Sequence, residues 1–205
     1  MANKAFSNLV LDDGTKVYTQ EYIQSLRDAD KKHPDKLKIV AQRGGQEDML
    51  AIDADIKICG GSRGGSKSFS SLMEVLKNIK NPDFHAVILR NEKDDLQSLV
   101  TDSYKLFSQF GTYNKSQNDM TWNFDNGGWL KFSYYAGAYQ DFKTRFQGRQ
   151  FAYICIDEGT QCPYKKFKYL LTNNRNAAHI RNRFWITCNP DPESWVRQFI
   201  DWCVG

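Results

Sequence analysis

The chain has 205 residues, enough for one sizeable α/β domain or two small ones. Hydrophobic residues make up 40% of the chain and aromatic residues 14%, and 28 Lys and Arg face 24 Asp and Glu, for a net charge of +4. This balance permits contact with nucleic acid without arguing for it. No apolar run approaches the roughly 18 residues of a membrane span, so we expect no membrane association.

In chain order, the predicted elements begin with a polar, irregular stretch over residues 1–45, which we interpret as an arm ahead of one domain at residues 46–205. Within that domain, apolar runs of strand length alternate with segments whose apolar residues recur at helical spacing. This alternation predicts an α/β fold with a mostly parallel sheet flanked by helices. The predicted helices are Thr19–Lys31, Gln46–Ile52, a helix that ends near Asn81, Asp95–Phe110 (stopped by Gly111), Tyr164–Asn173 and Glu193–Val204. The predicted strands are Asp55–Cys59, Phe84–Arg90, a β-hairpin within Met120–Tyr135, Phe151–Ile156 and Arg183–Cys188.

A glycine-rich segment separates the first predicted strand of the sheet from its helix. It reads Gly60-Gly61-Ser62-Arg63-Gly64-Gly65-Ser66-Lys67-Ser68. A strand, a glycine-rich loop, Lys-Ser and a helix are the context of a phosphate-binding loop, in which backbone N–H groups and the helix N-terminus surround an anion. In such a loop Lys67 reaches the β- and γ-phosphates of ATP, and the Ser68 hydroxyl binds Mg²⁺.

Ser66 departs from the common pattern, which has glycine before the lysine. Serine fits there if its backbone keeps a negative φ. The alternative is a plain glycine-rich turn with a chance lysine.

Two acidic residues, Asp157 and Glu158, follow the apolar strand predicted at Phe151–Ile156. In an ATPase, the first would hold Mg²⁺ and the second would orient and deprotonate the attacking water. Adjacent residues beyond a strand point in different directions, so the two can do different jobs. The alternative is a polar turn or a helix cap, which acidic residues also favour.

The last predicted strand ends in Thr187-Cys188-Asn189-Pro190. A Thr-x-Asn sequence beside a nucleotide could sense the γ-phosphate through a side-chain hydrogen bond. The alternative is that Asn-Pro starts a turn.

Taken together in this order, the motifs resemble the ATPase domain of the large terminase subunit of tailed bacteriophages. The resemblance covers roughly residues 42 to 195. Its five segments are Gln46–Leu50 (similar to a glutamine motif that contacts adenine), Gly60–Ser68 with Arg63 as the arginine inside the loop, Val87–Arg90 with the helix after it, Phe146–Glu158, and Thr187–Pro190 (similar to a coupling motif).

The resemblance implies an additional-strand P-loop ATPase that uses ATP and Mg²⁺ to drive double-stranded DNA into a preformed capsid, in the host cytoplasm. It implies a ring of subunits, and contacts with a portal protein and a small terminase subunit. The residues it assigns to nucleotide binding are Gln46, Gly61, Ser62, Arg63, Gly64, Gly65, Ser66, Lys67, Ser68 and Asn189. It assigns Ser68 and Asp157 to Mg²⁺, catalysis to Glu158, Lys67 and Arg63, and a role at a neighbour's ATP to Arg145 or Arg149, unless these two bind acidic residues locally. Family members continue into a nuclease domain, which the resemblance does not find here, so no nuclease activity is expected.

Two other functions stay open at this point: a related helicase-like P-loop motor, and a nucleotide-binding assembly module that does not hydrolyse ATP. The sequence does not reveal whether a DNA-binding surface forms. The basic residues considered for one are Lys165, Lys166, Lys168, Arg175, Arg181 and Arg183, although Lys165–Lys168 is expected to be the solvated face of a helix. The aromatic hairpin is expected to cover the sheet edge rather than to stack on DNA.

Overall fold

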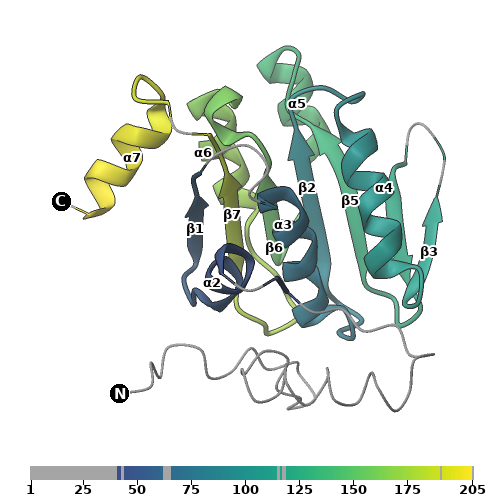
Figure 1. Cartoon of the computed structure of the whole chain (residues 1–205). Coiled ribbons are helices and arrows are strands. Elements are labelled where there is room, and N and C mark those ends of the chain that lie inside the picture. The colour runs from purple at the N-terminus through teal and green to yellow at the C-terminus, as the bar shows by residue number, and fades with distance from the viewer. Residues whose placement is uncertain are drawn as a thin grey trace, which may run out of the picture.

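One seven-stranded sheet lies between two layers of helices in the computed structural model (Figure 1). The structure describes residues 41–42, 44–61, 66–114, 116, 119–189 and 191–204. The helix predicted at Thr19–Lys31 and residues 1–40 of the predicted arm lie outside these ranges. No helix among the described residues is both long enough and apolar enough to cross a membrane.

The strand order across the sheet is β1-β7-β6-β2-β5-β4-β3. The pairs β1–β7, β7–β6, β6–β2 and β2–β5 are parallel. Strand β4 pairs antiparallel with both β5 and β3. The strands are β1 (Ile56–Cys59), β2 (His85–Arg90), β3 (Gly111–Asn114), β4 (Thr121–Phe124), β5 (Trp129–Tyr134), β6 (Tyr153–Ile156) and β7 (Arg183–Thr187). The helices are α2 (Gly45–Ala51), α3 (Lys67–Val75) followed by a 3-10 turn (Leu76–Asn78), α4 (Leu96–Phe107), α5 (Tyr139–Phe146), α6 (Tyr164–Asn173) and α7 (Trp195–Val204).

The central strand β2 shows how the sheet divides the core. Ala86 and Ile88 pack into the hydrophobic cluster under α3 and α4, whereas Val87 and Leu89 pack into the cluster under α5 and α6. All four side chains are fully buried, as expected for a parallel strand covered on both faces. The predicted mostly parallel α/β sheet flanked by helices is therefore confirmed.

Strand β7 lies between β1 and β6 although it comes last in the chain. In this position β7 corresponds to the inserted strand of the additional-strand P-loop fold that the family resemblance implies. It brings the ends of β1, β6 and β7 side by side, because parallel strands present their carboxyl ends at the same edge of a sheet. The glycine-rich loop after β1, the acidic pair after β6 and the Thr187–Pro190 segment at the end of β7 therefore meet at one edge of the sheet.

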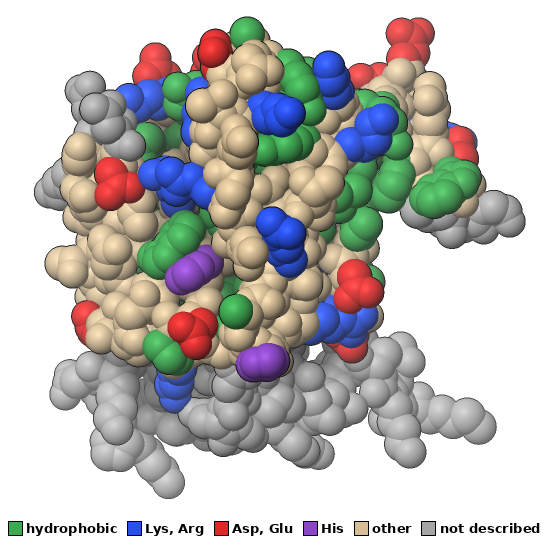
Figure 2. All heavy atoms as spheres, turned by 180° about the vertical axis from the view of Figure 1, so that it is seen from behind, with side chains coloured by type: hydrophobic (Ala, Val, Ile, Leu, Met, Phe, Trp, Pro, Cys, Tyr) green, Lys and Arg blue, Asp and Glu red, His purple; other side chains and the backbone are tan. Residues whose placement is uncertain are grey.

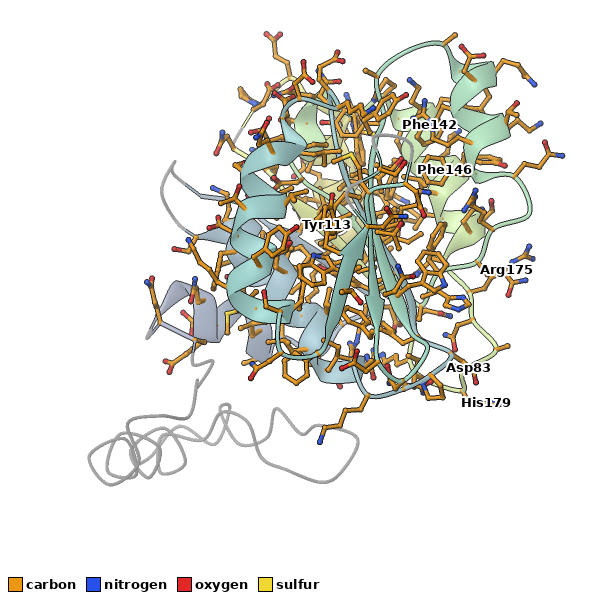
Figure 3. All side chains as sticks on the ribbon, turned by 90° about the vertical axis from the view of Figure 1, so that its right-hand side faces the viewer. Asp83, Tyr113, Phe142, Phe146, Arg175 and His179 are labelled. Carbon is orange, nitrogen blue, oxygen red and sulfur yellow. The ribbon has the colours of Figure 1, made fainter. Side chains whose placement is uncertain are left out.

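Two elements were not predicted: strand β3 and helix α5. Gly111, expected to stop the preceding helix, instead begins β3, where a Cβ atom would stand 2.2 Å from the carbonyl oxygen of Asn123. Glycine is required there because the two backbones approach so closely. Figure 3 views this edge and shows Tyr113 of β3 beside α4, with Phe142 and Phe146 of α5 on the other side of the sheet.

The predicted hairpin forms, as β4 and β5, and it extends the sheet. Trp122 is 1% exposed and donates its indole N–H to Ser103 Oγ of α4 at 2.8 Å. Phe132 is buried as well. Trp122 and Phe132 thus build the core, as predicted, and offer no surface on which a base could stack, whereas Trp129 is half-buried and stacks on His85.

A buried cluster of charged side chains, Lys57, Glu74 and Lys77, links β1 to α3 and to the end of α2. Glu74 accepts hydrogen bonds from Lys57 Nζ at 3.2 Å and Lys77 Nζ at 2.8 Å, and Lys77 also donates to the Leu50 carbonyl at 2.9 Å. Burial lowers the pKa of Lys77 to about 8, against the opposing effect of the Glu74 carboxylate.

This depressed pKa predicts a dependence of stability on pH. Between pH 8 and about 10.4, the unfolded lysine holds a proton that the folded one has lost, so the free energy of unfolding rises with pH. Measured by urea denaturation, the wild type should gain stability relative to Lys77→Met over this range, by at most about 1.4 kcal/mol per pH unit. The exposed Lys168→Met serves as the control. Parallel pH profiles for the wild type and Lys77→Met would contradict the prediction.

Candidate functional site

A cavity of about 740 Å³ opens at the carboxyl ends of the parallel strands, where ligands bind in open α/β sheets. Most predicted site residues that the structure describes line it. The lining includes Gln42, Gln46, Ser66, Lys67, Ser68, Arg90, Asp157, Glu158, Thr187 and Asn189. Ser62, Arg63, Gly64 and Gly65 lie outside the described residues.

Asp157 is the centre of the site, with no exposed surface. Its carboxylate accepts hydrogen bonds from Ser68 Oγ at 2.8 and 3.0 Å, from Arg90 Nε at 2.8 Å and from the Thr187 hydroxyl. These three donors come from α3, β2 and β7, so one carboxylate ties three elements together. A buried carboxylate needs such partners because desolvation strongly disfavours a bare charge.

Glu158 points toward solvent, since 41% of its side chain is exposed. Its Oε1 lies 3.7 Å from Arg90 Nη2, and its Oε2 accepts a hydrogen bond from Gln161 Nε2 at 3.1 Å. The backbone has φ of 59° in the left-handed region, and its N–H donates to Thr187 Oγ1 at 3.2 Å. The two adjacent acids therefore occupy different environments, as their different predicted roles require.

Lys67 links the loop to the end of β7. Its Nζ donates to the Gly61 carbonyl at 2.8 Å and to Asn189 Oδ1 at 3.3 Å, across 122 residues of sequence. Asn189 therefore does more than begin a turn: its side chain reaches the lysine of the glycine-rich loop.

Ser66 corrects one expectation from the sequence. Its φ is 54° and its ψ is 19°, in the left-handed region rather than at negative φ. The Ser66 carbonyl still accepts the first hydrogen bonds of α3, from the N–H of Ser70 at 2.9 Å and from the Ser70 hydroxyl at 3.0 Å. The left-handed conformation costs a serine about 1–2 kcal/mol, which explains why glycine is the common residue at this position.

Gln46 lies on α2 at the rim of the cavity, and 5% of its surface is exposed. Its Oε1 accepts a hydrogen bond from the backbone N–H of Gln42 at 2.8 Å, and the Gln42 side chain in turn lies 3.5 Å from Ser66 Oγ. Gln42 was not predicted. It connects the glutamine segment to the residue before Lys67.

Arg145 and Arg149 do not line this cavity. Arg145 Nη1 donates to the Tyr134 carbonyl at 2.7 Å, and its guanidinium lies 3.8 Å from the centre of the Tyr134 ring. Arg149 is exposed. The site of their own subunit therefore does not use either residue.

Arg90 is the main residue that the sequence reasoning missed. Its three guanidinium nitrogens all have partners: Nε contacts Asp157, Nη2 faces Glu158, and Nη1 donates to the Asp95 carbonyl at 2.7 Å and Ser98 Oγ at 2.9 Å. Arg90 thus connects both carboxylates to the start of α4. In the sequence, only its position at the end of an apolar predicted strand could have suggested that Arg90 belongs to the site.

The oxygen donors suit a hard cation. The Ser68 hydroxyl and the Asp157 carboxylate lie within hydrogen-bonding distance of each other beside the Glu158 carboxylate. Mg²⁺ typically takes one or two protein oxygens and completes its shell with water and substrate phosphates. In the described part of the chain, no group of three or more His, Cys, Asp or Glu could form an all-protein metal cage. The residues present fit Mg²⁺ held partly by a substrate.

Comparison with known proteins identifies a family. A family model described as terminase large subunit, T4likevirus-type, N-terminal, matches residues 58–204. No curated protein matches the chain by sequence.

Solved structures of phage terminases share the fold. The large terminase of a thermophilic bacteriophage matches with a TM-score of 0.62 at 17% identity, over 80% of this chain and 43% of that one. The bacteriophage HK97 large terminase matches with a TM-score of 0.61 at 12% identity, over 84% and 38%. The ATPase domain of the Thermus phage P74-26 large terminase gives 0.57 at 13% identity, over 78% and 69%. The first of these three proteins has also been solved with ADP and with ATP-gamma-S. The chain thus spans less than half the length of the first two terminases.

Removal of Arg90 should destabilise the protein through Asp157. Arg90→Met leaves a buried carboxylate without its cation, which should lower the free energy of unfolding by about 3 kcal/mol. In an Asp157→Asn background the same change should cost less than half as much, because no charge remains to be compensated. Urea denaturation of the four proteins measures this coupling. Equal costs in both backgrounds would show that the ion pair does not carry the effect, and Arg175→Met, on the surface, is the control.

Proposed function

Because the chain belongs to the terminase large-subunit family, we propose that it is the ATP-hydrolysing part of a viral DNA-packaging motor. The observation that carries this proposal is the convergence of Lys67, Ser68, Asp157 and Glu158 in one cavity at the carboxyl edge of the sheet. A plain glycine-rich turn or a strand-end cap would not require these segments to meet.

ATP is the proposed substrate. The thermophilic-phage terminase, which shares the fold, binds ADP and ATP-gamma-S according to its structures. In this chain, Lys67 would exchange its contacts with Gly61 and Asn189 for the β- and γ-phosphates, and the N-terminus of α3 adds partial positive charge there. Gln46 and Gln42 lie at the rim, where a base would sit. Arg63 and the loop glycines keep the phosphate-binding roles that the family resemblance implies.

Ser68 and Asp157 are the residues that would hold Mg²⁺. The ion, when bound, neutralises charge on the phosphates and polarises the γ-phosphoryl group. Arg90 holds the Asp157 carboxylate in place at 2.8 Å, and the buried setting strengthens these contacts.

Glu158 is the proposed general base. It would accept a proton from a water that attacks the γ-phosphorus as the bond to the β–γ bridging oxygen breaks, which yields ADP and phosphate. The partial exposure of its side chain leaves room for that water, whereas the Asp157 carboxylate is already engaged by Ser68, Arg90 and Thr187. Contacts from Gln161 and Arg90 orient the carboxylate.

Contacts at the end of β7 support a role in sensing the nucleotide. The Thr187 hydroxyl contacts both Asp157 and the Glu158 backbone, and Asn189 contacts Lys67. Loss of the γ-phosphate would change what Lys67 binds and so the position of Asn189. We infer that this strand end couples hydrolysis to movement of double-stranded DNA into a procapsid.

The remaining partners follow from the family alone. They are a ring of like subunits, a portal protein and a small terminase subunit, assembled in the host cytoplasm. Arg145 and Arg149 remain predictions for a contact with a neighbour's ATP, with Arg149 the freer of the two because Arg145 is tied to Tyr134.

The proposal predicts that Glu158→Gln abolishes ATP turnover. Removal of a general base typically costs about 10²–10⁴-fold in rate, while ATP binding should persist because Lys67 and Ser68 are intact. Phosphate release by the 205-residue chain, measured over a wide range of protein concentration, checks this. A rate per subunit that rises with concentration would support a ring with an arginine acting in trans.

The matched control is Glu193→Gln, which removes an exposed carboxylate outside the cavity. If the wild type binds ATP but releases no phosphate at any concentration, with or without DNA, the chain is a nucleotide-binding module and not a hydrolase. Equal turnover by the wild type and Glu158→Gln would remove Glu158 from the catalytic role.

A further inference from the structure

The basic residues considered from the sequence do not form one surface. Arg181 and Arg183 pair with Asp53, which lies before β1 at the opposite edge of the sheet from the nucleotide cavity. Lys166 is buried, contrary to the expected solvated helix face, and donates to the backbone carbonyls of Tyr135 and Gly137. Figure 2 shows lysine and arginine side chains spread over the back of the molecule with hydrophobic side chains between them.

Cations converge instead at a second, smaller cavity of about 240 Å³. It lies where β5 continues past the start of β4, next to the end of α5. Its lining residues include Phe132 and Tyr134 of β5 and Phe146 of α5, the last labelled in Figure 3. Four cationic side chains line it: Lys93, Lys131, Arg145 and Arg149.

The charge in this cavity is largely uncompensated. No Asp or Glu is among the described residues that line it. Asp119, just outside, pairs with Lys131 at 3.1 Å and accepts a hydrogen bond from Thr121. Within the described part of the chain, the side chains of Lys93 and Arg149 have no partner. At least two full positive charges therefore line this cavity with no carboxylate among its described lining residues, and an anion would be attracted there.

Arg145 is fixed in position before any ligand arrives. Its contact with the Tyr134 carbonyl covers the free edge of β5, and its guanidinium stacks on the Tyr134 ring. This hydrogen bond uses Nη1, which leaves further N–H donors of the fork for a ligand. A fixed arginine loses little conformational entropy when it binds a phosphate, so the cavity is organised in advance.

We propose that this cavity binds a backbone phosphate of double-stranded DNA. The inference rests on the proposed function and names a DNA-contact site within it. Its chemistry suits a phosphodiester: cations of both kinds line it, and no carboxylate is among the described lining residues.

Shape separates DNA from a neighbour's nucleotide as the source of the phosphate. Arg145 makes the distinction, because an arginine that acts on a neighbour must project outward to reach phosphates held in another cavity. Here the cations line a hollow, and Arg145 is tied back to its own strand. A hollow receives a group that protrudes, and the phosphates of a DNA duplex protrude along its surface.

The test is the salt dependence of duplex binding. Fluorescence anisotropy with a short duplex of mixed sequence, without nucleotide, gives the affinity of the full chain between about 50 and 200 mM salt. Arg149→Gln and Lys93→Gln should each weaken binding about fivefold to tenfold near 0.1 M salt and reduce the slope of log K against log salt by roughly one. Arg175→Gln removes the same charge from an exposed position after α6 and should change neither quantity.

Two outcomes overturn the proposal. Unchanged affinity and slope in both variants would remove the cavity from the DNA site. If Arg149→Gln leaves DNA binding intact but lowers the concentration-dependent part of ATP turnover, the cavity serves a neighbour's nucleotide. Since binding is measured without ATP, a chain that fails to hydrolyse ATP can still show the DNA effect, and a working ATPase can still lack it.

Discussion

The burial of one carboxylate, that of Asp157, constrains most of this structure. A charge without exposed surface is tolerated only when hydrogen-bond donors surround it. Ser68, Arg90 and Thr187 supply those donors, from the first turn of α3, the end of β2 and the end of β7. These elements must reach one point, which fixes the strand order around β6 and opens the cavity beside it.

Local pattern predicted the elements with many apolar residues. The observed bounds of α6 equal the predicted ones, and β2 starts one residue later than predicted. Both could be predicted because α6 buries residues at helical spacing and β2 is a continuous apolar run. Strand β3 has four residues and one large apolar side chain, Tyr113, too few to establish a period. Helix α5 buries only Phe142 and Phe146 in a polar stretch.

For the site, the sequence identified residues by motif and missed those whose role depends on distance. Lys67, Ser68, Asp157 and Glu158 could be named because each stands at a strand or loop end in a known spacing. Arg90 could not, since its partner lies 67 residues away and nothing local marks an arginine that will meet a carboxylate. The expectation of a negative φ at Ser66 was wrong, since nothing in the local sequence marks this residue as left-handed.

Glu158 holds a backbone conformation that glycine or asparagine adopts more readily. Neither of those residues carries a carboxylate. Replacing Glu158 with glycine would relieve this backbone strain and stabilise the fold by on the order of 1 kcal/mol. The residue that is present is one that this backbone conformation by itself disfavours, so the position carries a cost in stability for keeping a carboxylate at the mouth of β6.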